Sequence, residues 1–195
     1  MNPHRVLLIV VCLLVSSPAF AHSGHSTADF ASGFTHPFGG IDHVLAMVAV
    51  GLLAATLGGR ALWAVPAAFV TMMVVGGALG FARVQLPGTE IGIAVSIVVL
   101  GALMMFGWPR SGTGKRAISS VVAVAGAFAV AHGYAHGSEM PAASHAAAYM
   151  IGFVCSTVIL HGLGMVTGLT VFARPGIAGM TGTAITTWGL VILFT

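Results

Sequence analysis

Six long apolar segments divide the chain and predict its architecture. A helix needs about 20 predominantly apolar residues to cross the hydrocarbon core of a bilayer. The segments that approach or exceed this length cover residues 40–58, 61–82, 89–108, 117–138, 144–170 and 177–194. Stretches rich in Pro and Gly, at 108–112 and 174–176, separate the later segments and support their boundaries. The pattern predicts an all-α membrane protein, a compact bundle of six transmembrane helices.

The amino terminus has the pattern of a cleaved signal peptide. A short basic start precedes an apolar run at 6–15, and Ala19 and Ala21 form a cleavage site of small residues. This run is too short to span a bilayer and is typical of a secretory signal. We therefore expect residues 1–21 to be removed, with His22 as the new amino terminus. An uncleaved anchor is the alternative.

Basic residues are unevenly distributed between the predicted loops. If the mature amino terminus lies outside, the inner loops are those near residue 60 and at 109–116 and 173–176. These loops hold five Lys and Arg residues, whereas the outer loops hold only Arg83. Cytoplasmic loops of membrane proteins carry such an excess of Lys and Arg. We expect a multi-pass protein of the bacterial inner membrane with a periplasmic mature amino terminus.

Composition narrows the possible functions. The chain is 57% hydrophobic and only 6% charged, whereas a soluble domain has about 25% charged residues. Its seven Lys and Arg residues are dispersed along the chain, without the basic stripe of a nucleic-acid-binding protein. Nucleic-acid binding is therefore excluded. Nine histidines outnumber the four acidic residues, which directs attention to histidine chemistry.

Glycines at four-residue spacing indicate how the helices pack. Small residues let helix backbones approach closely in a bilayer. The pairs that have this spacing are Gly76/Gly80, Gly88/Gly92, Gly133/Gly137 and Gly164/Gly168. Together they favour a compact bundle over a loose set of anchors.

Two histidine motifs lie at the outer ends of the first and fourth predicted spans. Their chemistry-bearing residues are His36, Asp42 and His43 in the first, and His132, His136 and Glu139 in the second. The second set falls on one helix face. His132 lies about 10 Å below the outer end of its helix, and His43 lies about 10 Å below His36 if that segment is one helix. We expect the two motifs to converge at similar depth.

Further polar residues share this half of the membrane. Glu90 and His145 begin the third and fifth spans at their outer ends. Polar groups inside a membrane are costly and usually functional. Imidazole and carboxylate ligands without thiolate suit Ni(II), Co(II) or Zn(II). The two motifs together with Glu90 are therefore a candidate metal site.

Other histidines and methionines receive different interpretations. His161 lies in the middle of the fifth span, where a packing role is favoured. His22 and His25 near the mature amino terminus are candidates for capturing metal ions outside the membrane. Met47, one turn after His43, is a candidate soft neighbour of the site.

The two motifs, read as HPFGGIDHVLAM and HGYAHGSE, resemble those of the HupE/UreJ family of bacterial nickel permeases. The resemblance extends over most of the chain. It implies that residues 22–195 form one transport domain serving hydrogenase or urease maturation. It also implies uptake of Ni(II), and of Co(II) as a second substrate, with no permanently bound cofactor. The residues to which it gives functional roles are His36, Asp42, His43, Glu90, His132, His136 and Glu139.

Without the resemblance, the residues are compatible with three classes of function. The first is a metal-ion facilitator that is not an enzyme and has no ATPase motif, because Gly112 to Arg116 lacks the P-loop spacing. The second is a membrane-embedded hydrolase, in which the same cluster would hold a metal that activates water. The third is a haem protein with His43 and His132 as axial ligands. The acidic neighbours and additional histidines argue against the haem protein.

Overall fold

The computed structural model describes residues 25–106, 115–140, 145–170 and 175–194. Within these ranges every regular element is a helix. In chain order they are α2 (His25–Thr35), the 3-10 helix η1 (His36–Gly39), α3 (Ile41–Leu57), α4 (Ala61–Phe81), α5 (Thr89–Phe106), α6 (Lys115–Glu139), α7 (Ala146–Thr170) and α8 (Pro175–Phe194). The expected signal peptide, residues 1–21, and His22 lie outside the described residues.

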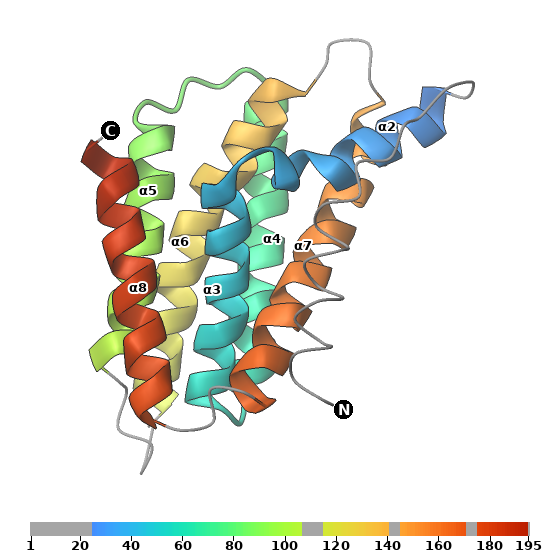
Figure 1. Ribbon diagram of the computed structural model, residues 1–195. Coiled ribbons are helices and arrows are strands. Elements are labelled where there is room, and N and C mark those ends of the chain that lie inside the picture. Colours follow the sequence, from blue (N-terminus) through green and yellow to red (C-terminus); the bar gives the residue numbers. More distant parts are fainter. Residues whose placement is uncertain (1–24, 107–114, 141–144, 171–174, 195) are drawn as a thin grey trace.

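Helices α3 to α8 run side by side, and α2 extends from one end of α3 across α7 (Figure 1). Each of the six predicted apolar segments corresponds to one of these six helices, with ends that agree to within two residues. Helices α4 to α8 are individually long and apolar enough to cross a membrane. Helix α3 has 17 residues and meets this standard only together with the helical stretch before it. The described part of the chain therefore has five candidate spans, or six if the bent pair counts as one.

A sharp bend separates α2 and η1 from α3. The two helical stretches meet at 88°, and Gly40 between them is extended, with φ −128° and ψ 126°. Pro37 lies in the first turn of η1, where its missing N–H costs no helical hydrogen bond. The estimate that His43 lies about 10 Å below His36 assumed one continuous helix. That assumption is wrong, because the chain changes direction at Gly40.

Glycines let α4 and α6 pack backbone against backbone. A β-carbon added at Gly76, Gly80, Gly133 or Gly137 would overlap a backbone carbonyl oxygen of the facing helix. Two of the predicted glycine pairs thus pack against each other, as small-residue pairs do in membrane bundles. Gly164 of α7 approaches the Val48 carbonyl of α3 in the same way, and Gly168 lies against the Ala55 side chain of α3.

In the remaining pair, Gly88/Gly92, only Gly92 packs against another helix: an added β-carbon there would lie 3.2 Å from Cβ of Ala131 in α6. Gly88 has a φ of +77°, and a β-carbon added there would meet nothing within 4 Å. It serves the turn before α5, where a left-handed conformation requires glycine. The prediction of a packing role was therefore wrong for Gly88, because a turn also selects glycine, whereas Gly92 does lie against a neighbouring helix.

Helix α2 is fixed to the end of α7 by close contacts and one hydrogen bond. Gly33 of α2 lies against the Tyr149 carbonyl of α7, and Gly152 of α7 lies against the Phe30 carbonyl of α2. The backbone N–H of His145 donates to the Asp29 carboxylate at 2.9 Å. These contacts hold η1 at the end of the bundle where α3, α5 and α7 begin and α6 ends.

Candidate metal centre

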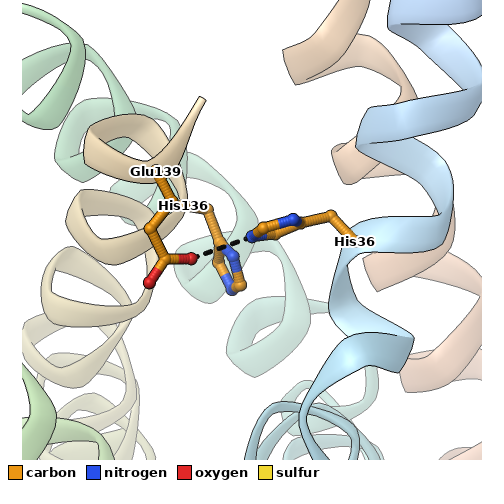
Figure 2. Close-up of side chains that lie close together, drawn as sticks. All are labelled: His36, His136 and Glu139. Atoms are coloured by element: carbon orange, nitrogen blue, oxygen red, sulfur yellow. Dashed lines mark hydrogen bonds and ion pairs between the residues drawn. The ribbon is translucent and has the colours of Figure 1, made fainter. Parts of the chain in front are cut away.

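His36, His136 and Glu139 come together at this end of the bundle (Figure 2). Each offers one ligand atom, and the three atoms lie within 4.8 Å of one another. Nε2 of His36 is 3.0 Å from Oε2 of Glu139. The rings of His36 and His136 meet edge to face, with centroids 4.8 Å apart. Small side-chain movements would bring these donors to the distance of about 2 Å at which imidazole and carboxylate bind a transition metal.

Two distant segments supply this group. His36 begins η1, and its partner Glu139 ends α6, 103 residues later. His136 and Glu139 are three residues apart and therefore share a helix face. The docking of α2 on α7 brings His36 over that face. The site thus depends on the peripheral helix as well as on the bundle.

A chain of histidine rings continues inward from this group. The ring centroid of His43 lies 4.4 Å from that of His136 and 5.8 Å from that of His132. His132 and His136 are fully buried, and the side chain of His43 is 13% exposed. The structure therefore brings together all four histidines of the two motifs, ordered His36, His136, His43 and His132.

Several ring nitrogens of these histidines have no hydrogen-bond partner. Among the described residues, Nδ1 of His43, Nε2 of His132 and both nitrogens of His136 are buried and unpaired. Leaving a buried polar group unpaired costs about 1–3 kcal/mol. Metal coordination would satisfy one such nitrogen on each ring, the one that carries the lone pair.

His132 shows most directly how such a ligand is oriented. Its Nδ1 lies 3.2 Å from the Phe128 carbonyl oxygen. A carbonyl only accepts, so this nitrogen carries the hydrogen and Nε2 keeps its lone pair. Histidines that bind metals commonly donate their second ring N–H to a backbone carbonyl in this way. Nε2 of His132 is thus prepared to bind a cation.

Asp42 places a carboxylate beside this series of histidines. Its Oδ2 lies 3.8 Å from Nε2 of His43, and its side chain is 23% exposed. Gly40 makes room for both residues, because an added β-carbon would lie 2.5 Å from Oδ1 of Asp42 and 2.8 Å from Cδ2 of His43. The absence of a side chain at Gly40 thus allows the motif to fold compactly.

Other candidate residues lie outside the three-residue group. Glu90 is in the first turn of α5 and is exposed. His145 is exposed and uses its backbone N–H to bind Asp29. The side chain of His25 is not among those described, although the residue begins α2. His161 is buried deeper in α7.

Sequence reasoning missed three residues that surround the histidines. The Tyr149 ring lies 5.7 Å from His36, the Phe153 ring 4.1 Å from His136, and the Phe69 ring 5.5 Å from His132. Tyr149 and Phe153 are four residues apart on the fifth segment, but apolar aromatic spacing is equally typical of ordinary helix packing.

Asp29 was also missed, although it is one of only four acidic residues in the chain. It precedes the first predicted span, where no helix was expected. The small number of acidic residues could have drawn attention to Asp29, because a charged side chain in so apolar a chain usually has a structural or functional role.

These features define a multi-pass helical membrane protein with a histidine and carboxylate group suited to a divalent metal ion. Comparisons with known proteins lead to the same class. The chain matches the family described as HupE / UreJ protein over residues 10–192. It is 40% identical over 197 residues to Protein HupE of Rhizobium leguminosarum bv. viciae, covering 99% of each chain.

The protein belongs to the HupE/UreJ family, whose members are generally nickel or cobalt transporters. This confirms the resemblance seen in the two motifs. It also confirms the expectation that the chain is not an enzyme, so the hydrolase alternative is not carried further. No solved structure matches the chain.

Proposed function

We propose that the protein takes up Ni(II), and Co(II) as a second substrate, across the bacterial inner membrane. The ion first binds to His36, His136 and Glu139. The observation that carries this proposal is the meeting of their donor atoms within 4.8 Å, from segments 103 residues apart. Imidazole and carboxylate donors without thiolate suit these borderline divalent ions.

Exposure gives the site a direction. The side chain of Glu139 is 51% exposed and that of His36 is 29% exposed, whereas His136 is fully buried. An ion can therefore replace part of its water shell at Glu139 and His36 before it reaches His136. Binding would displace the hydrogen shared by His36 and Glu139, since metal ligands must be deprotonated. His43 and His132 would take the ion next.

The acidic residues support this passage with charge. Asp42 lies beside His43, and Glu90 begins α5 at the same end of the bundle. We retain both as functional positions in the proposal. His22 and His25 would capture scarce ions before they reach the site.

The proposed orientation follows from the basic residues and the signal peptide. The end with the histidines faces the periplasm, and residues 1–21 are removed after export. With no ATPase motif in the sequence, the membrane potential is a sufficient driving force. It favours inward movement of a divalent cation by about 4.6 kcal/mol per 100 mV.

Accumulation of Ni(II), Co(II) and Zn(II) in cells that express the protein tests the function. Wild-type cells should accumulate nickel above control cells. His136→Ala should reduce uptake at least tenfold at low nickel, since even the loss of a residue that only orients a metal ligand costs about 10- to 100-fold. His145→Ala is the matched control, because this histidine is exposed at the same end. Equal uptake by wild-type and His136→Ala proteins at equal membrane levels would reject the site.

Cysteine labelling tests the orientation separately. Single cysteines at positions 115 and 141, in a chain with Cys12 and Cys155 replaced by Ser, should react differently with an impermeant reagent in intact cells. Position 141 should label and position 115 should not. The reverse pattern would place the histidine end in the cytoplasm and contradict uptake through it.

A further inference from the structure

One face of α7 continues the line of histidines into the bundle. Tyr149, Phe153, Thr157 and His161 are spaced by four residues and share this face. The first two contact His36 and His136. From Tyr149 to His161 the helix advances about 18 Å. Residues further along this face therefore lie inward of the metal group.

Two methionine sulfurs contact α7 at Thr157. Oγ1 of Thr157 lies 3.5 Å from Sδ of Met47 and 3.6 Å from Sδ of Met73. All three residues are 0% exposed. Thr157 also donates to the Phe153 carbonyl at 2.9 Å. Sulfurs from α3 and α4 are thus gathered around one hydroxyl of α7.

His161 lies one turn further along the same face. It is 1% exposed, and neither ring nitrogen has a hydrogen-bond partner. Its ring meets Phe69 edge to face at 5.2 Å, and Phe69 in turn lies 5.5 Å from His132. A packing role, which the sequence favoured, would be served better by an apolar ring, because two unpaired buried nitrogens cost free energy.

The three helices present these residues at matching positions. Met73 is one turn from Phe69 on α4, and Met47 is one turn from Gly51 on α3. An added β-carbon at Gly51 would overlap the His161 carbonyl. The same face of α3 therefore carries Met47 and packs against the turn that holds His161.

We propose that His161, with the sulfurs of Met47 and Met73, forms a second and deeper cation site, inward of His132. The inference rests on the proposed function and adds the next position on the ion's route. This site has one imidazole and two soft thioethers but no carboxylate, so nothing in it neutralises a divalent charge. It binds weakly, which suits a position that must release its ion. The Phe69 ring contacts both histidines, and the face of an aromatic ring attracts a cation.

Two measurements on wild-type and variant proteins test the second site. Equilibrium dialysis of the purified full-length protein against Ni(II) counts bound ions, and reconstituted vesicles give the rate of Ni(II) uptake. We expect His161→Phe to lose a weak class of bound ions. We also expect its maximal uptake rate to fall about tenfold, while the half-saturating nickel concentration changes less than about twofold.

The methionines provide an independent variant with little change in volume. Met47→Leu combined with Met73→Leu should lower the maximal rate about three- to tenfold by removing both sulfur ligands. Met104→Leu is the matched control. Met104 is buried on α5, and within the described residues its sulfur makes no hydrogen bond with α7. Its uptake should equal that of the wild type.

Several outcomes would overturn the second site. A folded His161→Phe protein that binds the normal number of ions and has a normal maximal rate would do so. A variant that is made in smaller amounts, but in which each folded molecule takes up nickel at the wild-type rate, would also do so. If His161→Phe does not reach the membrane, a normal rate in the double methionine variant is decisive. If wild-type vesicles take up no nickel, the proposed function fails, and the dialysis count still decides whether His161 binds an ion.

Discussion

The docking of α2 on α7 should control the metal group without touching the ion, and Gly33→Ala tests this. The added methyl group would overlap the Tyr149 carbonyl, so α2 must shift by about 1–1.5 Å to restore an ordinary contact. His36 follows three residues later and shifts with it. Functional sites need their ligands within about 0.5 Å of the productive geometry, and a displacement of about 1 Å can cost about 100-fold in rate. We expect uptake at low nickel to fall about 10- to 100-fold.

Gly162→Ala is the control for this prediction, because an added β-carbon there meets nothing within 4 Å. In both variants alanine raises helix propensity by about 1 kcal/mol, so propensity cannot explain a loss. Gly152→Ala alters the α7 side of the same interface and should reduce uptake to a similar extent as Gly33→Ala. The assay is uptake against nickel concentration, normalised to protein in the membrane. If Gly33→Ala behaves like Gly162→Ala, the docking of α2 does not control the site.

Three further predictions concern the motifs and the amino terminus. Asp42→Asn and His43→Ala should each nearly abolish nickel accumulation at low external nickel while the protein stays in the membrane; near-normal uptake would remove that residue from the site. The double variant His43→Ala with His132→Ala should be little worse than either single change, since ligands acting as one unit are strongly non-additive, whereas multiplied losses would indicate two separate sites. Amino-terminal sequencing of purified protein should begin at His22, and a chain beginning at Met1 would reject cleavage.

The spanning helices could be predicted because bilayer thickness sets their length. The apolar segments 61–82 and 89–108, for example, became α4 and α5 with nearly the same ends. Helix α2 could not be predicted, because its sequence is of mixed polarity and its helix is supported by contacts with α7 through Gly33 and Gly152. Such tertiary support leaves no periodic signal in the sequence.

The convergence of the two motifs could be anticipated from topology, but their local geometry could not. His43 and His132, placed at similar depth from helix positions alone, have ring centroids 5.8 Å apart. The bend at Gly40 was not foreseen, because Gly and Pro permit a break without fixing its angle. The unpaired nitrogens of His161 were also invisible, since a sequence shows a buried histidine but not what surrounds it.

The separation of His36 and Glu139 along the chain has a consequence for how the protein is made. At about 5–20 residues per second, ribosomes need about 5 to 20 s to add the 103 residues between them. During that interval the amino-terminal half already carries His36, His43 and Asp42 without their partners on α6. The proposed ion-binding group can form only after α6 has been synthesised, and its α2 support only after α7. A chain that ends before α6 therefore lacks His136 and Glu139, and a chain that ends before α7 lacks the contacts that hold His36 beside them.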